Sequence, residues 1–301
     1  MSAKTPNMRS VLRGVMPPIA MPFDKKGQFV KTGMREQIDL IIKAGASGIV
    51  AGGSTGEGHT LSDAEFVAAM TDAYEANAGR VPFLAGLIVN STIQAIDRIR
   101  MLDGMKITAL QVTPVHYLFK PDEKATIEHF RTIWEETRIP ILIYNVIPWN
   151  YLSVDMMLKI MDEVPGVVGM KQSSGDLKSL SDLLLRVQSR NVVMSGIDAL
   201  LYPGFAIGMH GAISALCSAV PGAVVKLGEL VEKNRHEEAR ALHFHLNRMW
   251  NEMPHEILPA CVKYVQHLQG VTLYHPRAPM VSPDAAMQKR IKAALKPVLA
   301  A

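Results

Sequence analysis

Residues 48–76 read GIVAGGSTGEGHTLSDAEFVAAMTDAYEA, and this stretch holds one complete strand–turn–helix unit. The run Gly48–Gly52 is entirely small or apolar, as expected of a parallel strand that is covered on both faces. Ser62, followed three residues later by Glu65, is typical of a capping box, and apolar side chains then recur every four residues from Phe66. A glycine-rich turn therefore joins a buried strand to an amphipathic helix.

The same unit recurs along the chain. Short apolar runs alternate with longer amphipathic stretches, which is the pattern of repeated β-α units around a parallel sheet. We expect strands at Met16–Phe23, Gly48–Gly52, Pro82–Ile88, Ala109–Thr113, Ile141–Asn145, Val167–Lys171, Val192–Ser195 and Gly211–Ser214. Eight strands, each followed by a helical stretch, predict an α/β protein that forms a closed (β/α)8 TIM barrel.

After residue 220 the alternation stops and the sequence becomes helical. Helices are expected near residues 223–234, 236–249, 256–268 and 286–295, with their ends limited by Pro254, Pro259 and Pro297. No composition shift or low-complexity linker separates this part from the rest. We therefore expect a barrel over residues 1–222 and appended C-terminal helices over residues 223–301, packed on the barrel as one elaborated domain.

The composition is that of a globular protein, with 48% hydrophobic and 20% charged residues and a formal net charge of +4. The basic residues are dispersed among acidic and apolar ones, so no nucleic-acid binding is expected. The chain has neither a signal-peptide pattern nor an apolar run of roughly 18 residues, so we expect a soluble, cytoplasmic protein without membrane contact. Cys217 and Cys261 lie in apolar stretches and are expected to be buried thiols.

Two residues at strand ends suggest catalysis, because the active site of such a barrel lies at the carboxyl ends of its strands. Lys171 follows the apolar run GVVGM, and apolar surroundings favour the neutral, nucleophilic amine that Schiff-base formation with a ketone requires. Tyr144 ends the preceding strand and can relay protons to and from the carbinolamine. A lone strand-end lysine is more often a snorkelling or salt-bridged residue, and a lone strand tyrosine more often packs. Their pairing in a barrel favours the catalytic interpretation.

The turn at residues 52–58 lacks the lysine of a phosphate-binding loop and the spacing of a dinucleotide fingerprint, so no nucleotide is implied. Gly53, Ser54 and Thr55 offer backbone N–H groups and two hydroxyls just before a helix, which suits a small anion such as a carboxylate. A plain tight turn is the alternative.

The chain has ten histidines, but they do not form a ligand set for a metal. The closest pair, His243 and His245, occupies positions i and i+2 of a helix and does not share a face. His59 and His116 fall in loops at the expected mouth of the barrel, where they contact either substrate or solvent.

These motifs together resemble the dihydrodipicolinate synthase/N-acetylneuraminate lyase superfamily of class I aldolases, over nearly the whole chain. The similarity rests on PIAMPF at 18–23, GGSTGE at 52–57, VTP at 112–114, YNV at 144–146, GMKQSSGD at 169–176, SGIDA at 195–199 and GAISA at 211–215. It implies a barrel followed by C-terminal helices, a homotetramer built as a dimer of dimers, and catalysis without metal or organic cofactor.

The resemblance also implies roles for individual residues. Lys171 would be the Schiff-base lysine and Tyr144 the proton relay. Ser54 and Thr55 would hold the carboxylate of a 2-oxo acid substrate. Ile213 would line the same pocket, and Gly196 would belong to the substrate-contacting stretch after strand seven.

Three departures from the family pattern bear on the reaction. Members that make dihydrodipicolinate carry an arginine shortly after YNVP, whereas residues 144–152 read YNVIPWNYL, with Trp149 and no arginine; this argues against dihydrodipicolinate synthesis. The stretch TPVHYLFKP at 113–121 is longer than its usual counterpart. Tyr117 is the candidate for the catalytic relay tyrosine that such enzymes lend across an interface, and His116 is the alternative. The stretch GLIVN at 86–90 is more apolar than usual, which suits a less charged partner than aspartate semialdehyde or a sialic acid.

The sequence therefore predicts a Schiff-base-forming lyase that cleaves or forms a carbon–carbon bond with pyruvate or a related 2-oxo acid. Two alternatives stay open. One is a dehydratase or deaminase that acts on a 2-keto-3-deoxy sugar acid through the same lysine, and the other is a non-catalytic binding or regulatory barrel. His59, Tyr117, Phe119 and Trp149 are the loop residues expected to select the aldehyde.

Overall fold

The computed structural model describes residues 7–115 and 117–301 of the chain. Its strands form one parallel sheet in the order β1-β8-β7-β6-β5-β4-β3-β2. They are β1 (Gly14–Val15), β2 (Ile49–Ala51), β3 (Phe83–Leu87), β4 (Ala109–Val112), β5 (Ile141–Asn145), β6 (Val167–Gln172), β7 (Val192–Ser195) and β8 (Gly211–Ala212).

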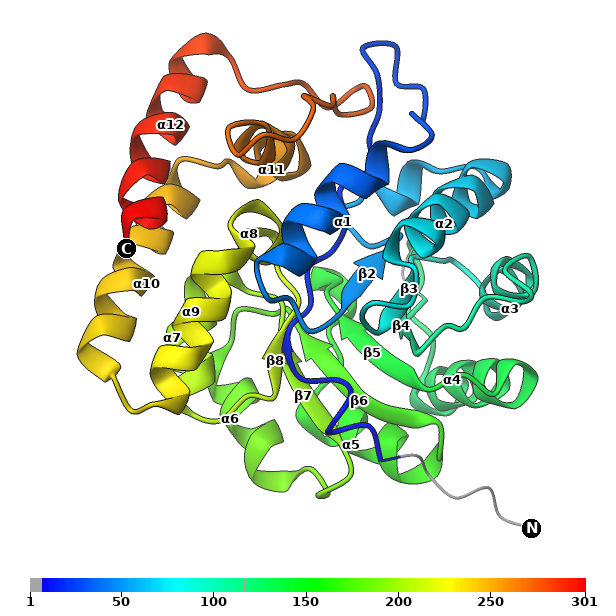
Figure 1. Ribbon diagram of the computed structural model, residues 1–301. Coiled ribbons are helices and arrows are strands. Elements are labelled where there is room, and N and C mark those ends of the chain that lie inside the picture. Colours follow the sequence, from blue (N-terminus) through cyan, green and yellow to red (C-terminus); the bar gives the residue numbers. More distant parts are fainter. Residues whose placement is uncertain (1–6, 116) are drawn as a thin grey trace.

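Hydrogen bonds between the first and last strands of this order close the sheet. The Ser47 N–H donates to the Val15 carbonyl at 2.8 Å, and the Val50 N–H donates to the Pro17 carbonyl at 3.0 Å. The Ile19 N–H then donates to the Val50 carbonyl at 2.8 Å. The predicted (β/α)8 barrel is therefore confirmed, with its helices outside the strands (Figure 1).

The first strand differs from its prediction. Regular pairing ends at Val15, whereas the sequence suggested a strand over Met16–Phe23. Pro17 and Pro18 have no N–H to donate, so the ladder cannot continue through them. The chain beyond stays next to β2 through an isolated bridge between Pro18 and Val50.

Over residues 7–115 and 117–301, the eight strands are each followed by an α-helix, as expected. These helices are α1 (Gly33–Lys43), α2 (Asp63–Asn77), α3 (Thr92–Arg100), α4 (Glu123–Thr137), α5 (Val154–Glu163), α6 (Leu177–Arg186), α7 (Leu201–Ala206) and α8 (Ala215–Ala219). The capping box predicted for α2 is present, because the Ser62 side chain accepts from the Glu65 N–H and the Glu65 carboxylate accepts from the Ser62 N–H.

Four more helices follow the barrel: α9 (Pro221–Glu232), α10 (His236–Asn251), α11 (Leu258–His267) and α12 (Ala285–Ala300). Figure 1 shows them in yellow to red along one side of the barrel, with the loop before α12 beside the blue loop that precedes α1, where Phe23 and His275 form a bridge. Pro297 lies inside α12 and does not end it as predicted. It falls in the last turn, where the missing N–H affects only the end of the helix.

Apolar side chains fill the inside of the barrel. This interior cluster comprises Leu12, Met16, Val50, Leu84, Ala109, Leu142, Val168, Val192, Met194 and Ile213. A second cluster packs the C-terminal helices together and contains both cysteines, which are free and buried as predicted. Within the described ranges, no helix combines the length and apolar character that crossing a membrane requires.

Candidate active site

Lys171 and Tyr144 lie side by side at the carboxyl ends of β6 and β5, where they are register partners. The Lys171 Nζ is 3.9 Å from the centroid of the Tyr144 ring. Both side chains are buried, with exposed fractions of 5% and 4%. The structure thus brings together the two residues that the sequence singled out for catalysis.

A change of alternation within β6 turns Lys171 toward the barrel axis. Val168 packs in the interior cluster, whereas Met170 packs in the cluster outside the barrel, so the in–out pattern changes at Gly169. A Cβ atom at position 169 would lie 2.2 Å from the Val192 carbonyl oxygen of β7. Only glycine fits there. The register between β5 and β6 shifts at the same place, because Ile141 pairs with Val167 and Leu142 pairs with Gly169, and this bulge turns Lys171 inward.

Gly196, directly after β7, leaves the space that the lysine side chain occupies. A Cβ atom on Gly196 would lie 2.5 Å from Lys171 Cε and 2.2 Å from Ser173 Oγ. The predicted residue Gly196 therefore borders the lysine. Ile213 packs in the interior cluster, and its carbonyl oxygen lies 3.4 Å from the same Cβ position.

The glycine-rich turn after β2 brings a hydroxyl to the tyrosine. Ser54 Oγ lies 3.1 Å from Tyr144 Oη, and either group can donate the hydrogen bond. The Gly56 and Gly58 N–H groups both donate to the Gly53 carbonyl at 3.1 Å, so Gly53 shapes the turn. This geometry links the predicted carboxylate-binding turn to the predicted proton relay.

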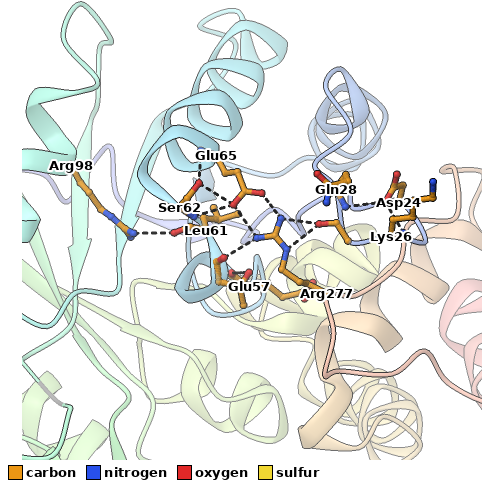
Figure 2. A network of polar contacts seen from close by, with 11 residues as sticks. Asp24, Lys26, Gln28, Glu57, Leu61, Ser62, Glu65, Arg98 and Arg277 are labelled. Atoms are coloured by element: carbon orange, nitrogen blue, oxygen red, sulfur yellow. Dashed lines mark hydrogen bonds and ion pairs between the residues drawn. The ribbon is translucent and has the colours of Figure 1, made fainter.

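A buried ion pair connects this turn to the C-terminal helix α11. Glu57 adopts left-handed backbone geometry (φ 51°), and its carboxylate accepts from Lys263 Nζ of α11 at 2.5 Å. Both side chains are 1% exposed. The Arg277 N–H donates to the same carboxylate at 2.9 Å, and Figure 2 shows the Arg277 side chain reaching on to Glu65 of α2. The C-terminal region therefore supports the turn that carries Ser54.

A cavity of about 400 Å³ opens beside these residues. The residues with polar side chains that line it are Ser54, Thr55, His59, Tyr144, Tyr151, Lys171, Ser173, Asp198, Ser214 and His255. The remaining lining residues are Val146, Pro148, Gly196, Ile197, Ala215, Trp250, Leu258, Pro259 and Met280.

The sequence model of the Dihydrodipicolinate synthetase family matches residues 11–298. The chain belongs to this family. It is similar to the 4-hydroxy-tetrahydrodipicolinate synthase of Syntrophotalea carbinolica, with 34% identity over 89% of this chain and 92% of that protein. The synthase of the same name from Neisseria meningitidis serogroup B is 33% identical over 95% of this chain and 98% of its own length. The crystal structure of dihydrodipicolinate synthase from Aquifex aeolicus has a TM-score of 0.86 at 27% identity, and the match covers 95% of this chain and 98% of that one.

The resemblance seen in the sequence is therefore confirmed. As a member of the dihydrodipicolinate synthetase family, the chain is an enzyme of the carbon–carbon lyase type.

Asp198 is a lining residue of this family member that the sequence reasoning did not single out, although it lies within the SGIDA motif. Its carboxylate accepts from the Leu216 N–H at 2.6 Å and is almost completely buried. Burial raises the pKa of Asp198 to about 6, against the opposing effect of hydrogen bonds from residues 214–216 and of the Lys171 charge. A titratable carboxyl group therefore lies close to the amine.

Two further lining residues were also missed. The Tyr151 hydroxyl donates to the Ser173 carbonyl at 3.4 Å, and burial, with a smaller contribution from Tyr144, raises the pKa of Tyr151. Ser173 Oγ is buried without a hydrogen-bond partner among the described residues. Ser173 lies in the GMKQSSGD motif, and Tyr151 lies within the stretch YNVIPWNYL at 144–152, which contains no arginine.

The predicted specificity residues fall into two groups. His59 lines the cavity, but Tyr117, Phe119 and Trp149 are 74%, 79% and 64% exposed. Tyr117 and Phe119 instead line a separate surface hollow of about 450 Å³. His116 lies outside the described residues. Over residues 7–115 and 117–301, no three His, Cys, Asp or Glu side chains gather into a metal-binding group.

Proposed function

We propose that Lys171 attacks the ketone of pyruvate, or of a related 2-oxo acid, and forms a Schiff base during carbon–carbon bond cleavage or formation. The observation that carries this proposal is the buried amine 3.9 Å from the Tyr144 ring, whose hydroxyl lies 3.1 Å from Ser54 Oγ. Addition of the amine to the ketone gives a carbinolamine, and loss of water gives the protonated imine. Tyr144 transfers the proton that the departing hydroxyl needs.

The carboxylate of the 2-oxo acid binds at the turn that carries Ser54 and Thr55. Both residues line the cavity together with Lys171, so the carboxylate and the ketone of one small substrate reach their partners simultaneously. The protonated imine then accepts the electron pair of an adjacent C–C or C–H bond. Because the imine itself stabilises the carbanion that this step forms, the proposed reaction needs no separate metal or organic cofactor.

The reaction of a 4-hydroxy-tetrahydrodipicolinate or dihydrodipicolinate synthase is a second candidate, because relatives at 33–34% identity are named 4-hydroxy-tetrahydrodipicolinate synthase. The stretch after β5 argues against it, since Pro148 and Tyr151 line the cavity there and no arginine is present. A reaction of pyruvate with aspartate semialdehyde tests this candidate directly. We expect no significant turnover.

A dehydratase or deaminase that acts through the same imine is a third candidate, because the sequence motifs are compatible with either reaction. Product analysis separates it from a lyase. Free pyruvate with an aldehyde indicates carbon–carbon cleavage, whereas a retained carbon skeleton indicates elimination.

Reductive trapping tests the Schiff base itself. Sodium borohydride added with pyruvate should fix a reduced adduct on Lys171, identified by peptide mass spectrometry. Lys171→Ala should abolish the adduct, whereas Lys178→Ala is the matched control, because Lys178 is 77% exposed on α6. An adduct that is absent from the wild-type protein, or that lies on another lysine, would refute the proposal.

We also propose a homotetramer of paired dimers, in which the loop with Tyr117 meets the partner chain. The exposed side chains of Tyr117, Leu118 and Phe119 support this proposal, because monomers rarely leave such apolar groups together in water. Light scattering should give the mass of four chains, and Leu118→Asp with Phe119→Asp should lower that mass. A monomeric wild-type protein would contradict it.

A further inference from the structure

The cavity beside Lys171 has one wall that the barrel does not supply. Trp250 at the end of α10, Leu258 and Pro259 at the start of α11, and Met280 in the loop before α12 all line it. Each presents an apolar surface, and Ile197 extends this surface from the loop after β7. The C-terminal region thus gives the catalytic cavity an apolar wall.

We infer that the carbonyl partner of the enzyme is an uncharged aldehyde with an apolar body, such as an aryl or branched alkyl aldehyde. This inference rests on the proposed Schiff-base chemistry at Lys171 and adds the class of the second substrate. It follows from three properties of the lining residues: their charge, their existing hydrogen bonds and their separation from nearby cations.

Charge is the first property. Among the described lining residues, Lys171 is the only lysine or arginine, and the reaction itself engages it. Asp198 contributes a carboxyl group, which would repel an anionic partner when ionised. Of the other lining side chains, only His59 and His255 could carry a positive charge. A carboxylate or phosphate on the aldehyde would therefore face the apolar wall without a permanent countercharge, which is strongly unfavourable.

The existing hydrogen bonds are the second property. Asp198 accepts from the Leu216 N–H at 2.6 Å, Ser214 Oγ lies 3.2 Å from Cys217 Sγ, and the Tyr151 hydroxyl donates to a backbone carbonyl. Ser173 Oγ is left without a partner among the described residues. Thr55, His59 and His255 are the other polar side chains that could bind a substrate hydroxyl. The hydroxyls of a polyhydroxylated aldehyde that face Trp250, Leu258 and Met280 would stay unpaired, whereas the single oxygen of an apolar aldehyde can use one of the polar side chains.

Separation from nearby cations is the third property. Lys25, Lys26 and Arg277 line a neighbouring hollow of about 590 Å³, and Met280 lines both that hollow and the catalytic cavity. The Arg277 guanidinium is already bound to Glu65 and to the Gly27 carbonyl. The basic residues of this region therefore lie in a different hollow from the reacting groups.

The reaction balances without any further reactant. The enamine derived from the pyruvate methyl group attacks the aldehyde carbon and forms the new C–C bond. The aldehyde oxygen takes up a proton and becomes a hydroxyl, and water hydrolyses the imine. The product is a 4-hydroxy-2-oxo acid with the apolar group on its hydroxyl-bearing carbon, and cleavage follows the same steps in reverse.

Three aldehydes of similar size test the inference: benzaldehyde, succinic semialdehyde and D-erythrose, each supplied with pyruvate. We expect kcat/KM for benzaldehyde to exceed the other two values by at least about tenfold, the discrimination that an apolar pocket typically achieves. An equal or higher value for either polar aldehyde would overturn the inference.

Borohydride trapping separates the two levels of the proposal. If pyruvate is trapped on Lys171 but benzaldehyde is not preferred, the substrate class is wrong and the Schiff-base chemistry stands. If pyruvate is not trapped, both fail.

Variants of the apolar wall test the same point. Trp250→Ala should lower kcat/KM for benzaldehyde by about tenfold or more, while the pyruvate adduct on Lys171 still forms and shows that the protein is folded. Phe244→Ala is the matched control, because Phe244 lies on the same helix with 51% of its surface exposed. Leu258→Arg should shift the preference toward succinic semialdehyde. An unchanged aldehyde profile in both wall variants would overturn the inference.

Discussion

Asp198 is a carboxyl group that folding buries close to the Lys171 amine, and burial raises its pKa to about 6. A carboxyl group with a raised pKa in the folded protein favours folding in its protonated form. Its stabilising contribution is complete below the pKa of the unfolded chain, about 4, and is lost as the pH rises through about 6. Ionised Asp198 is thus a local source of instability at neutral pH.

Asp198→Asn should remove this pH dependence. Between pH about 4 and about 6, the free energy of unfolding of the wild-type protein should fall relative to that of the variant by on the order of 2–3 kcal/mol. Urea denaturation of both proteins at several pH values across this window measures the difference. A difference that stays constant would show that folding leaves the pKa of Asp198 unchanged, and a change in the opposite direction would show that folding lowers this pKa; either result would contradict the prediction.

At the scale of single residues, the sequence identified Lys171 and Tyr144 because both end apolar strands and therefore fall at the site. Asp198 and Ser173 lie inside motifs that were equally visible, but nothing in the sequence shows that their side chains face the lysine. Trp250 and Leu258 give no local signal at all. Their presence in the cavity depends on how α10 and α11 pack against the barrel.

Among the elements, β6 shows how packing determines the direction in which a side chain points. Its sequence predicts a buried strand, but a plain alternation from Val168 would direct Met170 inward and Lys171 outward. The change at Gly169 reverses this direction. The change occurs where β7 approaches so closely that a Cβ atom at position 169 would lie 2.2 Å from a backbone oxygen.

Gly169→Ala should therefore displace the end of β6 and with it Lys171. Because the clash is with the Val192 carbonyl, which no side-chain rotation relieves, we expect a loss of stability of about 1–3 kcal/mol. We also expect little or no pyruvate trapping. Gly228→Ala is the matched control, since its Cβ atom would make ordinary contact with Phe205 at 3.6 Å. Unchanged trapping in Gly169→Ala would contradict this account.

Elements with strong local signals matched their predictions best. The start of α2 is set by the reciprocal bonds of Ser62 and Glu65, which depend on neighbouring residues alone. The first strand was predicted less well, because pairing depends on donors that Pro17 and Pro18 lack and on the approach of β2. Local chemistry predicts helix starts, whereas strand ends depend on the partner strand.

At the scale of the whole molecule, the count of eight β-α units was enough to predict closure of the barrel. The repeat does not predict that the C-terminal region contacts the glycine-rich turn after β2. Lys263 and Glu57 are 206 residues apart in the sequence, yet they form a buried ion pair. Their contact links α11 to the turn that carries Ser54 and Thr55.

Removing one member of this ion pair should lower the stability of the protein and its affinity for pyruvate. Lys263→Met leaves the Glu57 carboxylate buried without its main partner, and removal of one member of a buried pair typically costs about 3–5 kcal/mol. The displaced turn should also raise the KM for pyruvate. Glu57→Gln combined with Lys263→Met should recover much of the stability, because the uncompensated charge is then gone.

Urea denaturation of the wild-type protein, both single variants and the double variant completes this cycle. The control is Lys233→Met, which breaks an exposed pair with Glu229 and should change stability by less than about 0.5 kcal/mol. Recovery of stability without recovery of the KM for pyruvate would show that the Glu57 charge orients the turn, beyond stabilising the fold. A Lys263→Met variant as stable as the control variant would show instead that the C-terminal helices do not support the turn.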